Sequence, residues 1–134
     1  MANLKQIEGI GDVYAAKLFE IGLVTTEALL NKGATPEGRH EIEAKTGISH
    51  EKILDWVNRA DLFRIKGVAE EYSDLLEASG VDTVPELAQR NPVNLLNKMT
   101  EVNGEKRLVR RLPTQREVSN WVEHAKVLPR RVTY

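Results

Sequence analysis

The chain of 134 residues has no cysteine, few aromatic residues and no long apolar run. Without cysteine, disulfide bonds, thiolate nucleophiles and Cys-ligated zinc sites are excluded. No stretch approaches the roughly 20 apolar residues of a membrane-spanning helix, and the first residues lack the apolar core of a signal peptide. We therefore expect a soluble cytoplasmic protein, whose length suits one compact domain or two very small ones.

Recognisable catalytic patterns are also missing. The sequence contains no phosphate-binding Walker loop, no dinucleotide fingerprint and no Ser-His-Asp arrangement. His40 and His50 each stand beside a glutamate, but their spacing matches no established metal site, and both lie in polar stretches where exposed histidines are common. We expect no enzymatic activity, no cofactor and no metal site.

The charge is nearly balanced overall but unevenly distributed. Residues 1–103 carry a net charge of −6, whereas residues 104–134 carry +5. Such an asymmetry suggests a polyanionic partner for the basic part, or pairing of that part with the acidic body of the same chain.

An internal repeat organises the chain. Residues 7–14 (IEGIGDVY) align with residues 65–72 (IKGVAEEY) at an offset of 58, and the segments WVNRA at 56–60 and WVEHA at 121–125 align at an offset of 65. Repeats of this kind indicate duplicated supersecondary units. We predict two related halves, residues 1–61 and 62–134, with no flexible linker between them.

The local patterns predict an all-α fold. Glycines at 22, 47, 80 and 104 follow helical patterns, where a left-handed residue ends a helix. Thr35-Pro36 and Asn91-Pro92 are typical helix starts, and 83–86 and 114–117 have capping-box spacing. Trp56 and Trp121 lie on or beside apolar helical stripes and are expected in the core. We predict roughly ten short helices in two similar bundles packed as one compact unit.

The glycine-containing segments of both halves resemble the helix-hairpin-helix motif, in which a Gly-apolar-Gly turn joins two helices. Over nearly the whole chain, the tandem arrangement also resembles an uncharacterised bacterial family of tandem helix-hairpin-helix proteins, which is a domain of unknown function. In the second copy Ala69 replaces the second glycine. The positions that carry the motif are Leu4, Ile7, Gly9, Ile10, Gly11, Ala15 and Leu18 in the first half, and Leu62, Ile65, Gly67, Val68, Leu75 and Leu76 in the second.

This resemblance implies sequence-independent binding of the DNA or RNA backbone, or packing and protein contacts alone. A helix N-terminus can hold phosphate through its N–H groups and dipole, which makes Gly9, Ile10 and Gly11 candidate contacts. However, motifs that bind nucleic acid usually carry Lys or Arg after the second glycine, whereas Asp12 follows Gly11 and Glu70 follows Ala69. Each turn is therefore interpreted either as a phosphate-binding turn or as a self-capped turn with a structural role only.

The basic stretch at 105–112 (EKRLVRRL) offers a second candidate surface. At about 100° per residue, its four cations would span an arc of roughly 140° on a helix, opposite the apolar Leu108, Val109 and Leu112. The alternative is a solvated face that pairs with the acidic body. The candidate nucleic-acid-binding cations are Lys106, Arg107, Arg110, Arg111 and Arg116.

We expect a non-catalytic module that binds nucleic acid through these residues. The alternative is a protein-interaction or assembly module, with an acidic protein as partner of the basic surface and the repeat as a scaffold only. The sequence leaves the oligomeric state open.

Overall fold

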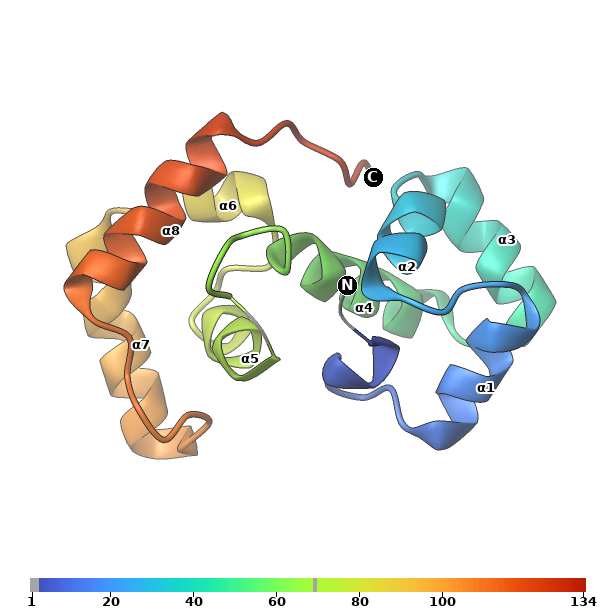
Figure 1. Ribbon diagram of the computed structural model, residues 1–134, viewed down its shortest axis with the longest axis horizontal. Helices are drawn as coiled ribbons and strands as arrows, with labels where there is room; N and C mark the ends of the chain where they lie inside the picture. The colour runs from blue at the N-terminus through green and yellow to red at the C-terminus, as the bar shows by residue number, and fades with distance from the viewer. Residues whose placement is uncertain (1–2, 69) are drawn as a thin grey trace. The chain divides into compact units, whose positions relative to one another are not determined.

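The computed structural model describes residues 3–68 and 70–134, and its regular structure is helical throughout these ranges (Figure 1). The extended backbone there pairs only at an isolated bridge between Asn3 and Thr25. The all-α prediction is confirmed. The described helices are the 3-10 helix η1 (Leu4–Gln6) and α1 (Asp12–Glu20), α2 (Thr26–Gly33), α3 (Pro36–Thr46), α4 (His50–Leu62), α5 (Glu70–Ala78), α6 (Val84–Ala88), α7 (Pro92–Lys106) and α8 (Gln115–Val127).

Across the described residues, every helix is too short or too polar to cross a membrane.

Most of the predicted helix ends are confirmed. The Thr35 hydroxyl accepts a hydrogen bond from the Gly38 amide, and the Asn91 side chain accepts from the amides of residues 93 and 94. Thr114 and Glu117 form the reciprocal capping box that their spacing predicts. These side chains satisfy amide groups that a helix cannot pair internally at its first turn. Three of the four predicted glycines, at 22, 47 and 80, have positive φ.

One predicted helix end is wrong, and one predicted capping hydrogen bond is absent. Gly104 lies inside α7, which continues to Lys106. The Thr83 side chain makes no capping hydrogen bond at α6. There the Glu86 carboxylate accepts a hydrogen bond from the Asp82 amide instead, at 3.0 Å. Helix α6 nevertheless begins directly after Thr83, which is its N-cap residue.

The chain forms two compact units, and each is described by itself. Unit 1 comprises residues 1–61 together with 131–134, and unit 2 comprises residues 62–130. The last four residues fall in the second half of the sequence repeat but belong to unit 1. The Arg39 guanidinium, only 2% exposed, holds them there by donating to the carbonyl of Thr133 at 2.6 Å.

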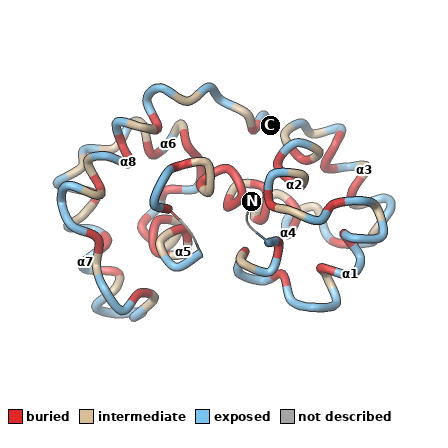
Figure 2. The backbone as a smooth tube through the Cα atoms, in the orientation of Figure 1, coloured by how far each residue is buried: buried red, intermediate tan, exposed pale blue. Residues whose placement is uncertain are grey.

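The core of unit 1 includes Trp56 of α4. Figure 2 shows buried positions along the backbone of this unit. Trp56 is 2% exposed, which confirms that it is a core residue. Its ring contacts Tyr14 of α1, with ring centroids 5.1 Å apart and planes at 60°. Other buried residues come from every helix of the unit and include Leu4, Ile10, Leu18, Leu29, Ile42, Ile53 and Val57.

Unit 2 places Trp121 of α8 in the same kind of environment. Trp121 is 3% exposed and lies 5.2 Å from the ring of Tyr72 on α5, with the planes at 53°. Helices α5, α6 and α7 contribute further core residues, including Leu75, Leu76, Val84, Leu87, Leu95 and Met99. The two units therefore share a tilted Tyr–Trp pair between a helix after the glycine turn and the last long helix of the unit.

Candidate functional site

The predicted helix over residues 105–112 is wrong. Helix α7 ends at Lys106, and Arg107 adopts the left-handed conformation with φ 50° and ψ 50°. Pro113 disfavours helical backbone at the residue before it, and Val109 enters the core of unit 2 from the non-helical segment. The cations therefore do not share one helical arc. They lie at the end of α7, in the loop over residues 107–114 and in the first turn of α8.

The segment over residues 106–116, which we call the basic loop, is fixed by polar contacts within unit 2. The Asn103 side chain donates to the carbonyl of Val109 at 3.2 Å and accepts from its amide at 3.0 Å. The Tyr72 hydroxyl donates to the carbonyl of Arg111 at 3.0 Å. With the Val109 side chain only 6% exposed, the loop has a defined conformation and its charged side chains project from a fixed backbone.

Arg111 is occupied by an intramolecular partner. Its guanidinium donates to both carboxylate oxygens of Glu117, at 3.0 and 3.2 Å. The hydrogen bond from Arg111, together with the Thr114 amide, lowers the pKa of Glu117 to about 2, and the same pair raises the pKa of Arg111. A bidentate pair of this kind is strong for a surface contact, so Arg111 is poorly placed to bind an external anion.

The other four predicted cations remain available. Lys106, Arg107, Arg110 and Arg116 are all exposed. Within residues 3–68 and 70–134, none of them forms an ion pair or a side-chain hydrogen bond. The loop thus presents four uncompensated positive charges within residues 106–116.

The first glycine turn is built around Ile10. Gly9 has φ 94°, Ile10 is buried in the core of unit 1, and Gly11 is the exposed N-cap of α1. Because Gly11 has no side chain, α1 begins without a side-chain cap. Asp12, in the first turn, forms an exposed ion pair with Lys5 at 2.6 Å, and the Lys5 hydrogen bond lowers its pKa.

The second turn has the same glycine geometry. Gly67 has φ 92°, and a Cβ there would lie 3.1 Å from Nε1 of Trp121; the corresponding distance from Gly9 to Trp56 is 3.2 Å. Ala69, the predicted replacement of the second glycine, lies outside the described residues. A groove of about 520 Å³ runs beside this turn and is lined by Lys66, Gly67, Glu117, Asn120, Trp121 and His124.

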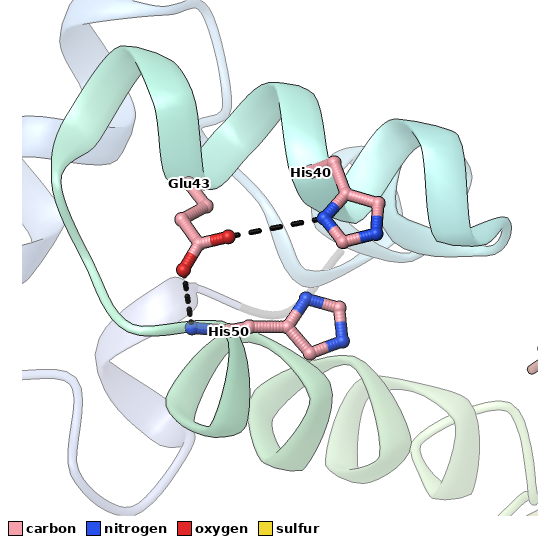
Figure 3. A group of neighbouring side chains, drawn as sticks. All are labelled: His40, Glu43 and His50. Atoms are coloured by element: carbon pink, nitrogen blue, oxygen red, sulfur yellow. Dashed lines mark hydrogen bonds and ion pairs between the residues drawn. The ribbon is translucent and has the colours of Figure 1, made fainter.

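On their spacing alone, His40 and His50 are rejected as metal ligands, and the sequence does not foresee that they lie together with Glu43. The structure brings His40 and Glu43 of α3 next to His50, the first residue of α4 (Figure 3). The i,i+3 spacing of His40 and Glu43 on a predicted helix was the available signal. The approach of His50 depends on the turn at Gly47, and the sequence pattern alone does not define the direction in which α4 leaves that turn.

Comparison with known proteins adds a family but no characterised relative. Neither the curated proteins nor the solved structures contain a significant match to this chain. The family model described as a domain of unknown function (DUF4332) matches residues 8–128, and the chain accordingly belongs to this family.

Proposed function

We propose that the protein is a non-catalytic module that binds the backbone of nucleic acid through the basic loop of unit 2. The carrying observation is the set of four exposed cations, Lys106, Arg107, Arg110 and Arg116, without intramolecular partners among the described residues. Cations that are already paired with carboxylates gain little from binding phosphate. These four cations can displace the counterions that surround a nucleic acid. The release of those counterions is the main source of non-specific affinity for nucleic acid.

The conformation of Arg107 supports this proposal. A non-glycine residue in the left-handed region costs roughly 1–2 kcal/mol, and helices commonly place glycine at this position. Arg107 is the sole such non-glycine residue in the described ranges. Strain retained at an exposed charged residue points to a role for the side chain outside the fold.

We further propose that each unit contains a helix-hairpin-helix motif, as the sequence resemblance implies. Gly9 and Gly67 have φ values of 94° and 92°, and each approaches Nε1 of the tryptophan in its own unit. In unit 1, the uncapped start of α1 at Gly11 is a second candidate contact for phosphate. Such contacts read charge and spacing rather than base identity, so binding would be independent of sequence. The function presupposes the cytoplasmic location expected from the sequence.

The test is an anisotropy titration of duplex DNA, single-stranded DNA and RNA at several salt concentrations. The double variant Arg110→Gln/Arg116→Gln should weaken binding to every sequence alike. It should also reduce the slope of log affinity against log salt by about 0.9 for each lost contact to a duplex phosphate. The matched control Lys98→Gln/Lys126→Gln removes the same charge from α7 and α8, at cations already paired with Glu101 and Glu123. It should bind nearly as the wild type does.

Arg107→Gly separates binding from folding at a single position. Glycine relieves the left-handed strain, so the variant should be at least as stable as the wild type, while binding should weaken. Gly11→Asp tests the α1 start in unit 1, provided that circular dichroism shows an intact fold. If the wild type binds no nucleic acid even at low salt, or if the control pair weakens binding as much as the loop pair, the proposal is wrong.

The second candidate is a protein-interaction module, favoured by the acidic residues at two helix starts. Asp12 lies in the first turn of α1, and Glu70 and Glu71 lie in that of α5. Carboxylates there already complement the helix dipole and repel phosphate. Capture of an acidic protein that persists after nuclease treatment and is lost in Arg110→Gln/Arg116→Gln would favour this candidate.

A further inference from the structure

Two imidazoles and a carboxylate converge in unit 1, and none of these residues is used in the proposed function. One potential ligand atom from each of His40, Glu43 and His50 lies within 4.8 Å of the others. The imidazole rings of the two histidines are stacked, with centroids 5.0 Å apart and planes at 23° (Figure 3). His40 is exposed, whereas Glu43 and His50 are half-buried.

One oxygen of the Glu43 carboxylate accepts a backbone hydrogen bond, and the other faces the His40 ring. Its Oε2 accepts a hydrogen bond from the backbone amide of His50 at 3.2 Å, which links it to the start of α4. Its Oε1 lies 3.8 Å from Nδ1 of His40, and both atoms face the space beside the His50 ring in Figure 3. The carboxylate is therefore positioned as a one-oxygen ligand.

The His50 side chain supplies an independent indication of a missing partner. Its Nδ1 is buried and has no hydrogen-bond partner among the residues that the structure describes. In Figure 3 this nitrogen points toward the His40 ring. A buried polar atom without a partner is costly and calls for an explanation, such as an ion.

We propose that His40, Glu43 and His50 form a binding site for a divalent transition-metal ion of the Zn²⁺ type. Two imidazole nitrogens and one carboxylate oxygen are a donor set that suits Zn²⁺, with water as the fourth ligand. Mg²⁺ and Ca²⁺ prefer oxygen ligands throughout. The bound ion would join α3 to α4 across the turn at Gly47.

The geometry needs only side-chain adjustment. Ligand atoms around one tetrahedral zinc ion lie about 3.3 Å apart, given metal–ligand distances of about 2.0–2.1 Å. The group must therefore contract by about 1.5 Å from its widest separation of 4.8 Å. The His40 side chain is 69% accessible and is therefore free to rotate toward the other two ligands.

The test is a titration of tag-free, metal-free protein with Zn²⁺ at about pH 7.5, because protons compete with the metal ion for its ligands at lower pH. Calorimetry should give saturable binding with one ion per chain. Imidazole resonances of His40 and His50 should shift in NMR spectra while those of His124 do not. His124 serves as an internal control because it lies in unit 2, where its Nδ1 accepts from the Lys66 amide. Zn²⁺ should also raise the melting temperature. Mg²⁺ should neither bind saturably nor raise the melting temperature.

Three variants identify the ligands. His40→Gln, His50→Gln and Glu43→Gln should each weaken Zn²⁺ binding by about tenfold or more. Glu43→Gln retains an acceptor for the His50 amide, so the start of α4 stays intact. Glu51→Gln, which removes an exposed carboxylate next to His50, should change the affinity less than about twofold. Circular dichroism of the metal-free variants checks the fold.

The proposal is wrong if Zn²⁺ binding is not saturable, if shifts appear at His124 rather than at His40 and His50, or if the Gln variants bind as tightly as the wild type. None of these results depends on nucleic-acid binding, so the two proposals stand or fall separately.

Discussion

At the scale of single residues, the most constrained positions are the two glycines beside the tryptophans. Gly9 and Gly67 combine a positive φ with a close approach to an indole nitrogen. Either feature alone disfavours a side chain, and together they explain why both copies of the repeat retain glycine there. Gly11 differs, since its φ of −91° suits any residue and no described heavy atom lies within 4 Å of where its Cβ would be.

We therefore predict opposite outcomes for two neighbouring substitutions. Gly9→Ala should lower the free energy of unfolding by about 1–2 kcal/mol, because alanine is strained in the left-handed region and its Cβ would press on Trp56. Gly11→Ser should leave it unchanged or raise it by up to about 1 kcal/mol, because Gly11 is the N-cap of α1, has open space at its Cβ position, and serine is at least as good an N-cap as glycine. Urea unfolding followed by tryptophan fluorescence measures both. Equal effects of the two changes would contradict the assigned geometry.

At the scale of elements, side-chain contacts in the basic loop determine where α7 ends, whereas helical periodicity predicts a later end. The alternation of cations and apolar residues over 105–112 fits a helix, but the chain leaves the helix after Lys106. Asn103 pairs with both backbone groups of Val109, and Glu117 serves as cap for α8 and as partner of Arg111. These side-chain contacts replace the hydrogen bonds that a longer helix would have made.

The double role of Glu117 predicts a pH-dependent contribution to stability. Its pKa is lowered from 4.5 to about 2 in the folded chain. A lowered pKa means that the folded state favours the carboxylate, so this contribution is fully present above about pH 4.5 and is lost as the pH falls toward 2. Glu117→Gln should therefore be less stable than the wild type at pH 7, and the difference should narrow over that range.

Chemical denaturation at a series of pH values measures this difference. Glu105→Gln removes the same charge from the exposed end of α7 and should leave the unfolding free energy at pH 7 nearly unchanged. A wild-type advantage over Glu117→Gln that stays constant down to pH 2 would exclude the ion pair as its source.

At the scale of the whole molecule, the chain returns to its first unit at its end. Residues 131–134 join unit 1, where the Thr133 amide donates to the carbonyl of Ala34 at 2.8 Å and the Tyr134 ring lies 5.8 Å from the Arg39 guanidinium carbon. Burial lowers the pKa of Arg39, and its hydrogen bonds to the carbonyls of Gly33 and Thr133 compensate the buried charge.

Deletion of residues 131–134 should thus destabilise unit 1 by about 1–3 kcal/mol, since a buried donor loses its acceptor. In the shortened chain, Arg39→Met should recover part of the loss, because no buried charge then remains unpaired. Urea unfolding of the wild type, the deletion, Arg39→Met and the combined variant gives the coupling free energy between the deletion and the substitution. Simple additivity of the deletion and the substitution would argue against this role of Arg39.

The compact arrangement expected from the sequence predicts a single cooperative unfolding transition. No Gly-, Ser- or Pro-rich linker separates the two halves of the sequence. Scanning calorimetry should show one transition whose calorimetric and van't Hoff enthalpies agree. Two well-separated transitions would show that the units unfold independently.

The sequence by itself determined the helical class, most helix ends and the burial of both tryptophans. These features follow from local rules. Capping side chains act within one helical turn, and the apolar face of an amphipathic helix is buried regardless of which element packs against it. Only the tertiary structure decided which cations are free, because Arg111 finds its partner Glu117 only once the loop is folded. Likewise, His50 meets His40 and Glu43 only after the turn at Gly47 brings α4 back along α3, and residues 131–134 join unit 1 through a buried arginine more than 90 positions away. Such contacts depend on where distant segments lie in space, which no local pattern records.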